Sequence, residues 1–335
     1  MMCLNSLAAR GAWRLGARLS AVLLCFGAAQ AQVVGTGATS VRDLMAAWTA
    51  QYGTVTGGAS YEATGSSMGV TKASDQTVDF GVTDVALTAA ALRQAGLRQA
   101  PLAATAVVVI VNLPELAGKP LKLNGDVLAD IYQGTITQWN HSQITGANPG
   151  LALPNKPIVP VWRADGSGQT YEFSTYLARS NAKWRRTTGS TYNMTVSVGK
   201  SARGGQALVD LVKATPGAIG YDGIGAAQKS GLVVAELRNA DGKSVAPSAA
   251  SIGASVEAAQ WSQDANSADL DGASGAASYP ITTVAYVLMA SAPKAGRKNP
   301  QTFIQAAVAQ GDALVRQAGL VPLGAKAKAL VAGLR

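Results

Sequence analysis

Three short segments of the sequence combine glycine with hydroxyl side chains just before a helical pattern. They are residues 35–40, 61–69 and 163–168. At the start of a helix, backbone N–H groups without an internal partner and the helix dipole both favour an anion, and glycine lets the backbone approach it closely. One such turn alone is more typical of an ordinary helix cap. Three turns together, one of them with an arginine, favour an oxyanion-binding site.

Arg163 and Asp165 strengthen this interpretation. The guanidinium group of Arg163 can present a fixed fork of N–H donors to two oxygens of a tetrahedral anion while Asp165 holds it in place. The alternative is a surface ion pair, which would contribute little to stability. Asp84 follows a predicted strand, and its carboxylate either belongs to the same site or caps the turn after the strand.

The composition favours a globular chain with a packed core. Of the 335 residues, 48% are hydrophobic and 14% are charged, which argues against a disordered chain. The net charge is +9, but the basic residues are scattered singly, so we expect no nucleic-acid partner. One histidine and two cysteines are too few for a zinc, copper or iron–sulfur site. We therefore expect neither a metal ion nor another cofactor.

The first 31 residues have the features of a secretory signal peptide. Three arginines precede a short apolar run at 19–29, and an A-x-A pattern ends at Ala31, which predicts export and cleavage after Ala31. The apolar run is too short for a membrane anchor, and no later segment is long enough to cross a bilayer. Cys25 leaves a lipoprotein as a minor alternative. Because both cysteines lie in this segment, the mature chain would have no disulfide.

Strand patterns alternate with helical patterns along the rest of the chain, which predicts an α/β fold. Apolar residues at helical spacing predict a helix from Val41 to Tyr52, with Thr39 or Ser40 as its cap. The apolar run at 105–112 predicts a strand buried on both faces, as is typical of parallel sheets. Similar strands are expected at 158–162 and 281–289, and further helices at 125–133, 170–179, 205–214 and 302–317. The weakly patterned stretch 239–278 is expected at the surface.

Eight segments match one known family in order and spacing. They are GTGAT at 35–39, GSS at 65–67, DFGVTD at 79–84, NLP at 112–114, IYQGTITQWN at 131–140, NPG at 148–150, RADGSG at 163–168 and PGAIGY at 216–221. With them, the chain after residue 31 resembles the PstS family, the periplasmic phosphate-binding proteins of the phosphate ABC importer, over nearly its whole length.

This resemblance implies a two-lobed periplasmic-binding-protein fold of type II. Each lobe would be a mixed, mostly parallel sheet flanked by helices, and two strands would form the hinge. Residues 32–106 and 284–335 would make lobe I, and residues 107–283 would make lobe II. The alternative is a single split near Pro154 into two sequential domains, which would lose the shared cleft.

By the same resemblance, inorganic phosphate would be held in the cleft between the lobes. Lobe I would contribute Ala38, Thr39, Ser40, Ser66 and Asp84. Lobe II would contribute Arg163, Ser167, Gly168 and Gln169, while Asp165 would orient Arg163. An ionised Asp84 would accept a hydrogen bond from protonated phosphate and repel sulfate, which has no proton to donate.

The chain also departs from the family. Ser40, Met68 and Gln169 stand where many relatives have phenylalanine, glycine and threonine. Gln169 would replace one hydroxyl donor, and the loss of one neutral hydrogen bond would weaken binding about tenfold.

The resemblance implies a protein without catalytic activity that delivers phosphate to an ABC permease and its ATPase subunit. It would act as a monomer that is not embedded in the membrane. The departures leave open a paralogue that binds another oxyanion or acts in secretion or sensing. A phosphatase with Ser66 or Ser167 as nucleophile is a further alternative. It would need a nearby base, whereas the single histidine, His141, is predicted to lie in a solvated loop.

Overall fold

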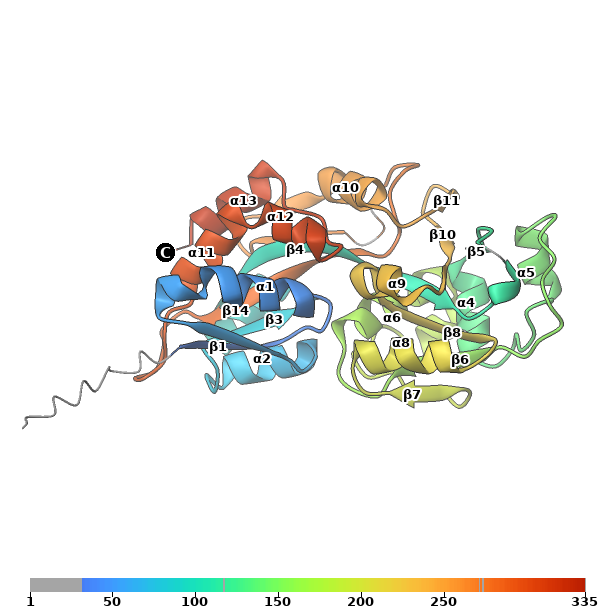
Figure 1. Cartoon of the computed structure of the whole chain (residues 1–335), viewed down its shortest axis with the longest axis horizontal. Coiled ribbons are helices and arrows are strands. Elements are labelled where there is room, and N and C mark those ends of the chain that lie inside the picture. Colours follow the sequence, from blue (N-terminus) through green and yellow to red (C-terminus); the bar gives the residue numbers. More distant parts are fainter. Residues whose placement is uncertain (1–31, 117, 271, 273, 335) are drawn as a thin grey trace, which may run out of the picture. The chain divides into compact units, whose positions relative to one another are not determined.

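A mixed β-sheet with helices packed on its faces runs through the chain (Figure 1). In the computed structural model the described residues are 32–116, 118–270, 272 and 274–334, so the predicted signal peptide at 1–31 lies outside them. Within these residues the main sheet has nine strands. Their order is β2 (Ala59–Ala63), β1 (Val33–Gly37), β3 (Phe80–Thr83), β14 (Thr282–Ala290), β4 (Leu97–Val111), β8 (Ala218–Gly223), β6 (Val159–Arg163) and β7 (Lys200–Ala202), and β9 (Val233–Val234) pairs with β4.

Two small sheets and the helices complete the described chain. The small sheets are formed by β5 (Lys122–Leu123), β10 (Glu236–Arg238) and β11 (Ser244–Val245), and by β12 (Gln260–Ser262) and β13 (Ser267–Asp269). The helices are α1 (Arg42–Tyr52), α2 (Ser66–Ser74), α3 (Ala89–Ala95), α4 (Gly125–Tyr132), α5 (Ser142–Ala147), α6 (Gly168–Ser180), α7 (Ala182–Thr187), α8 (Gly205–Ala214), α9 (Ile224–Ser230), α10 (Ala249–Ala258), α11 (Gln301–Gln310), α12 (Asp312–Gln317) and α13 (Ala325–Ala332), with 3₁₀ turns at Gly53–Thr56 and Pro114–Leu116.

The long strand β4 joins the two halves of the sheet. Its residues 97–106 pair with β14, and its residues 107–111 pair with β8. We call β2, β1, β3 and β14 the first half of the sheet, and β8, β6 and β7 the second half. The change of partner between Ala106 and Val107 lies at the lobe boundary that the family resemblance leads us to expect.

The predicted burial of the run at 105–112 is confirmed, but its expected parallel pairing is wrong. All but one of the residues of β4 are buried, yet β4 is antiparallel to both β14 and β8. Helices cover both faces of this mixed sheet, so a continuous apolar run indicates burial without revealing the direction of the neighbouring strands.

Most predicted helices form where the apolar spacing places them. In α1 the side chains of Leu44, Met45, Trp48 and Tyr52 face the core, which confirms the helical period. In α6, Ser167 is the N-cap, and its Oγ accepts the Thr170 N–H at 3.3 Å. This capping bond fixes the first residue of the helix. The third glycine turn, at 163–168, therefore ends at the start of α6.

The single helix predicted at 302–317 is wrong, because the chain forms α11 and α12 on either side of Gly311. Gly311 packs tightly against α1. A Cβ atom at this position would lie 2.4 Å from Nε1 of Trp48 and 2.3 Å from the Ala307 carbonyl oxygen. The apolar period continues across the break, so the sequence pattern did not reveal it.

The expectation of a surface segment at 239–278 is also partly wrong. This stretch contains α10, whose Ile252 and Ser255 are fully buried. The β12–β13 hairpin is held by Gln99, whose side-chain amide donates to the Ala265 carbonyl at 2.5 Å. Small residues such as Ala and Ser fit a close-packed interior as well as a surface, and composition alone does not separate the two.

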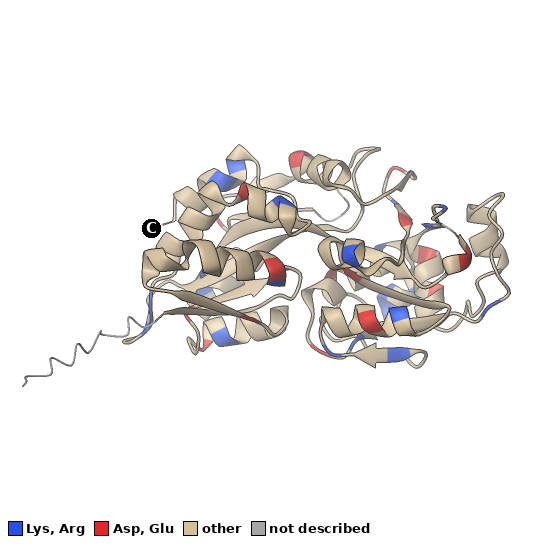
Figure 2. Cartoon of the chain, viewed as in Figure 1, with Lys and Arg blue, Asp and Glu red and all other residues tan. Residues whose placement is uncertain are grey.

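Positive and negative residues are scattered over the described chain in the view of Figure 2. Among the described residues, no helix combines the length and apolar character needed to cross a bilayer.

Candidate functional site

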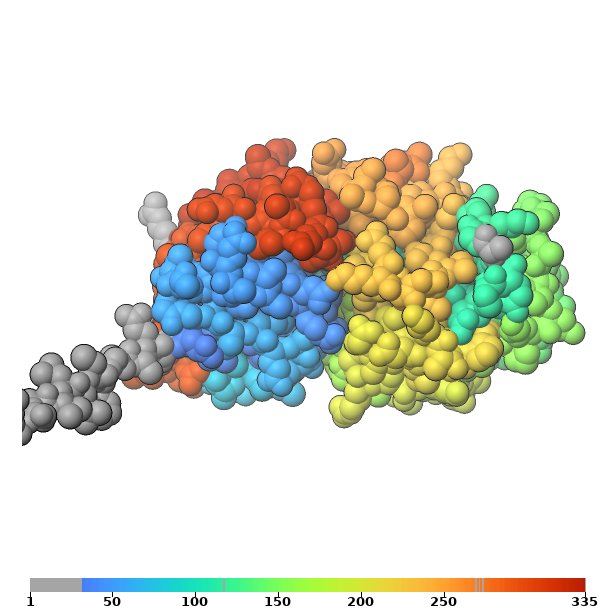
Figure 3. All heavy atoms as spheres, viewed as in Figure 1, coloured from blue at the N-terminus to red at the C-terminus, as the bar shows by residue number. Residues whose placement is uncertain are grey.

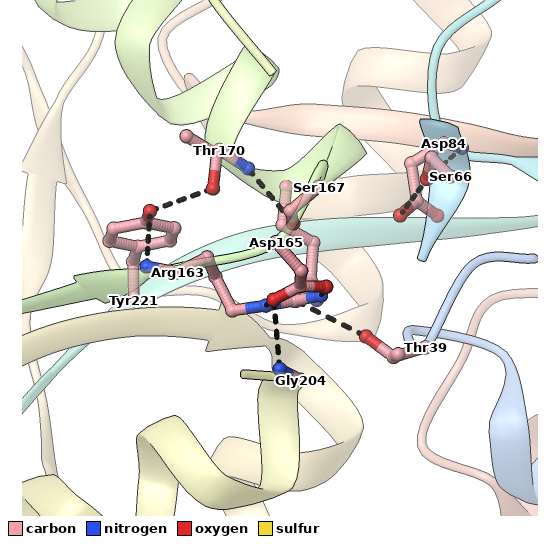
Figure 4. Close-up of polar contacts among 10 residues, drawn as sticks. Thr39, Ser66, Asp84, Arg163, Asp165, Ser167, Thr170, Gly204 and Tyr221 are labelled. Carbon is pink, nitrogen blue, oxygen red and sulfur yellow. Dashed lines mark hydrogen bonds and ion pairs between the residues drawn. The ribbon is translucent and has the colours of Figure 1, made fainter. Parts of the chain in front are cut away.

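The three glycine and hydroxyl turns meet where the two halves of the sheet face each other (Figure 4). Residues 38–40 follow β1, Asp84 follows β3, and Arg163 ends β6. Nη1 of Arg163 donates to Oγ1 of Thr39 at 3.3 Å, which joins the second half to the first. The N–H of Ser67 donates to the Gly166 carbonyl at 3.3 Å, a second link between the halves. The sequence therefore predicted correctly that these turns converge.

Asp84 is a buried carboxylate surrounded by hydroxyl groups. It is 2% exposed, and it accepts hydrogen bonds from Oγ of Ser40 and, at 3.3 Å, from Oγ of Ser66. Its own N–H donates to Oγ of Ser66 at 3.2 Å. The carboxylate thus bonds other segments and does not cap its own turn, the alternative that the sequence left open.

Burial raises the pKa of Asp84 to about 6, and the nearby Asp222 adds to the increase. The hydroxyl groups of Ser40 and Ser66 and the charge of Arg163 oppose the increase. Desolvation disfavours the charged form of a carboxyl group, whereas hydrogen-bond donors and positive charge favour it. Near neutral pH Asp84 is therefore mostly ionised, as an acceptor for a protonated ligand must be.

The Arg163 guanidinium is buried and held in place by Asp165. Nε donates to Oδ1 of Asp165 at 2.7 Å, and Nη2 donates to Oδ2. The Gly204 N–H donates to the same Oδ1 at 2.8 Å. Burial alone would raise the pKa of Asp165, but Arg163 and the Gly204 N–H hold it below its ordinary value. This two-point contact orients the remaining guanidinium edge, with Nη1, toward Thr39 and Gln169.

Tyr221 and Thr170 help to position the backbone of Arg163. The Arg163 N–H donates to Oη of Tyr221 at 3.3 Å, and this hydroxyl lies 2.8 Å from Oγ1 of Thr170. Both residues are buried. The PGAIGY segment therefore contributes an orienting contact, which the sequence motif alone did not indicate.

Thr39 and Ser40 do not cap α1, so that prediction is wrong. The N-cap position is taken by Val41, and the two hydroxyl groups bond Arg163 and Asp84 instead. Ala38 lies at the same turn, but its N–H already donates to the Val82 carbonyl at 2.9 Å. Ala38 therefore shapes the turn, and the side chains that follow it supply the polar groups.

Gln169 occupies the position beside the guanidinium. Its Oε1 accepts a hydrogen bond from Nη1 of Arg163 at 3.0 Å, and the side chain is 2% exposed. Gly168 and Ser167 precede it at the start of α6. A Cβ atom on Gly168 would lie 2.5 Å from Oγ of Ser66, so this glycine permits close contact between the two halves.

Asp222 was not among the residues singled out from the sequence. It lies at the end of β8, is 3% exposed, and acts on the pKa values of both Asp84 and Arg163. The available signal was an acidic residue directly after the PGAIGY motif, within a strand that is otherwise apolar or glycine.

The raised pKa of Asp84 makes a prediction about the stability of the protein without a ligand. Between about pH 4 and pH 6 the folded state holds more protons than the unfolded state, so stability falls as pH rises through this window. Full ionisation costs about 3 kcal/mol, since one pKa unit corresponds to about 1.4 kcal/mol. We expect the free energy of unfolding of Asp84→Asn, relative to the wild type, to increase by about this amount between pH 4 and pH 7. Urea unfolding at both pH values measures it, and an unchanged difference would contradict the raised pKa.

The sequence is similar to known binding proteins over most of its length. Residues 27–309 match the PBP superfamily domain. Over 299 residues the chain is 36% identical to a phosphate-binding protein PstS of Xylella fastidiosa, an alignment that covers 87% of this chain and 81% of the relative. It is 32% identical to a phosphate-binding protein PstS of Haemophilus influenzae, with 88% and 89% of the two chains covered.

Solved structures share the fold. A high-affinity periplasmic phosphate-binding protein (PfluDING), solved with phosphate, matches with a TM-score of 0.70 at 22% identity over 90% of this chain and 93% of its own. A phosphate ABC transporter substrate-binding protein of Clostridium perfringens with bound phosphate matches with a TM-score of 0.61 at 22% identity over 87% and 99%. These matches confirm the α/β periplasmic-binding-protein fold expected from the sequence.

Proposed function

Because the chain belongs to the PstS phosphate-binding proteins of the PBP superfamily, we propose that it binds inorganic phosphate between the two halves of the sheet. The observation that carries the proposal is the convergence of Arg163 and Asp84 from opposite halves of the sheet. Arg163 bonds the hydroxyl group of Thr39, and Asp84 bonds those of Ser40 and Ser66. A guanidinium group binds anion oxygens strongly, while an ionised carboxylate requires that the anion also has a proton to donate.

Apart from Ala38, whose N–H donates to the Val82 carbonyl, the proposed phosphate contacts are those implied by the resemblance to the family, with Asp165 as the residue that positions Arg163. They are Thr39, Ser40, Ser66, Asp84, Arg163, Ser167, Gly168 and Gln169, at the turn that Ala38 begins. Calorimetric titration with phosphate tests the proposal directly. Saturable binding with one phosphate per chain would support it, and absence of heat at millimolar phosphate would contradict it.

The two halves of the sheet are proposed to act as lobes that close over the ligand. Lobe I would contain residues 32–106 and 284–335, lobe II residues 107–283, with β4 and the start of β14 as the hinge. Phosphate stabilises the closed arrangement because it contacts both lobes at once, which the open arrangement does not allow.

Gly168→Ala tests the close approach of the lobes. The added Cβ atom would lie 2.5 Å from Oγ of Ser66 and 2.8 Å from Cβ of Asp84. The two lobes could then not approach each other as closely at this point. We expect phosphate affinity to fall by about tenfold, the equivalent of about 1.4 kcal/mol. In the control Gly253→Ala, on α10, the added Cβ contacts nothing within 4 Å and affinity stays unchanged. Equal affinities of the two variants would contradict the proposed closure.

The proposed physiological role is delivery of phosphate to an ABC permease, with ATP hydrolysis by a separate ATPase subunit. The protein would be a periplasmic monomer, exported by a signal peptide that is cleaved after Ala31. Catalysis is not part of the proposal. His141 caps α5, where its Nδ1 accepts the Gln143 N–H at 3.3 Å, so its ring is engaged outside the site. Release of phosphate from a generic ester by the purified protein would contradict this assignment.

One observation favours a second candidate, a protein that binds another oxyanion. Gln169 and Ser40 differ from the family pattern, and both contact the central charged groups, Arg163 and Asp84. Competition titrations with arsenate, sulfate and phosphonates compare the two candidates. Tighter binding of any of these anions than of phosphate would favour the second.

A further inference from the structure

A cavity of about 140 Å³ adjoins the proposed phosphate site. It lies between the start of α1 and the helices α8 and α9, and Figure 3 shows the blue segment of α1 beside the yellow segment of α8 and α9. Thr39 and Ser40 line it from the first half, and Asp222 and Gly223 line it from the second. Two proposed phosphate-binding residues, Thr39 and Ser40, therefore line the same cavity as Asp222.

Asp222 is a second buried carboxylate, and it lines this cavity. Its Oδ1 accepts the Gly223 N–H at 2.8 Å. Both carboxylate oxygens lie against Gly205, the first residue of α8, within 2.7 and 2.8 Å of the place where a Cβ atom would stand. Because the charge of Arg163 is paired with that of Asp165, ionised Asp84 and Asp222 would add two negative charges to the site.

The side-chain amide of Gln169 has an N–H donor near Gly223, which also lines the cavity. The amide nitrogen Nε2 is buried and has no hydrogen-bond partner among the described residues. It lies 2.9 Å from where a Cβ atom of Gly223 would stand. The Gln169 amide lowers the pKa of Asp222, so the two groups are neighbours, although their geometry falls short of a hydrogen bond. A buried donor without an acceptor is costly, and an anion oxygen between Gln169 and Asp222 would satisfy it.

We propose that Asp222 is a second acceptor for a ligand proton, so that the site binds phosphate together with two protons. One protonated oxygen would donate to Asp84. The other would lie between Gln169 and Asp222, where it would accept from the Gln169 amide and donate to Asp222. The unprotonated oxygens would face Arg163. The inference rests on the proposed phosphate binding and adds a specificity-determining residue to it. A singly protonated dianion has only one proton for two carboxylates, and the second carboxylate would repel it.

Other charged groups lie near Asp222 or line the same cavity. Arg163 on β6, Arg42 on α1 and Asp84 interact with Asp222 through their charges, while Asp43 on α1, Asp210 and Lys213 on α8 and Lys229 on α9 line the cavity. Asp43 and Lys229 form an ion pair with each other. Burial raises the pKa of Asp222, while Arg163, the Gly223 N–H, Gln169 and Arg42 oppose this. The positive groups therefore do not cancel the effect of burial, and a shared proton at Asp222 is favoured.

Proton uptake during phosphate binding tests the proposal. Near pH 8, where most free phosphate is singly protonated, we expect the wild type to take up about one proton per phosphate. Calorimetry in two buffers with different ionisation enthalpies measures this number. The dissociation constant is expected to increase by about tenfold per pH unit in this range.

Asp222→Asn should bind phosphate with no proton uptake and with a flatter dependence of affinity on pH. The control Asp210→Asn, an exposed carboxylate at the edge of the same cavity, should match the wild type.

The possible outcomes separate the two proposals. Phosphate binding without proton uptake by the wild type would overturn the role of Asp222 and leave phosphate binding intact. Uptake that persists in Asp222→Asn would also overturn it, because the proton would then reside elsewhere. No phosphate binding by the wild type at any pH would overturn the proposed function itself. If Asp222→Asn does not fold, Asp222→Thr, which keeps a small polar side chain, takes its place in the same comparison.

Discussion

Arg163→Ala is expected to weaken phosphate binding by at least about a hundredfold. A hydrogen bond to a charged group contributes about 1.5 to 3 kcal/mol, and the guanidinium edge that Asp165 does not use has more than one N–H donor for the anion. The substitution also leaves the half-buried Asp165 without its guanidinium partner, so that the site, which also contains Asp84 and Asp222, becomes strongly negative. Repulsion of an anion then adds to the loss of the donors.

Calorimetric titration of Arg163→Ala, with Arg186→Ala as a control on the exposed side of α7, measures this effect. Ser66→Ala serves as a second comparison, since it removes a neutral hydroxyl from the same site. We expect Arg163→Ala to lose more affinity than Ser66→Ala, and Arg186→Ala to match the wild type. Equal, small losses in the two site variants would refute the assignment of Arg163 as the main anion-binding group.

Asp84→Asn is expected to abolish most of the preference for phosphate over sulfate. In the wild type, an ionised Asp84 accepts a hydrogen bond from protonated phosphate, whereas sulfate would meet it with like charge. Such a juxtaposition costs several kcal/mol in a buried site. The amide of asparagine has N–H donors that an unprotonated oxygen can use, so sulfate binding improves while phosphate loses an acceptor. We expect the ratio of the two affinities to change by about two orders of magnitude.

Competition titrations of sulfate against phosphate measure this ratio near neutral pH, where Asp84, with its pKa of about 6, is mostly ionised. At pH 5 the wild type should discriminate less, because a protonated Asp84 no longer repels sulfate. Asp75→Asn, at an exposed position after α2, is the matched control. A wild-type sulfate discrimination that survives in Asp84→Asn would show that another group excludes sulfate.

Asp84→Asn therefore has opposite expected effects on stability and selectivity. The same burial that raises the pKa of Asp84 makes its charge costly in the folded protein and effective against sulfate. A binding site that holds a destabilising charge for its ligand is a common form of trade-off between stability and function.

The sequence by itself determined the local features of the site. Glycines before hydroxyl groups marked the turns at residues 35–40, 61–69 and 163–168, and the apolar period located α1 and α6. These features depend on neighbours within one turn of a helix or one strand, so a short window contains the information. The motifs also indicated the family, since their order and spacing do not depend on knowing any contact.

Only the tertiary structure decided which distant groups meet. Thr39 and Ser40 have the residue types of helix caps, but Arg163 and Asp84 compete for their hydroxyl groups. The run at 105–112 is equally apolar whichever way its neighbours point, and β4 proved antiparallel to both. Asp222 was not singled out from the sequence, and only the fold placed it, at the end of β8, beside Gln169 and the cavity. Such contacts join segments far apart in sequence, and their energies depend on burial and charge, which exist only once the chain has folded.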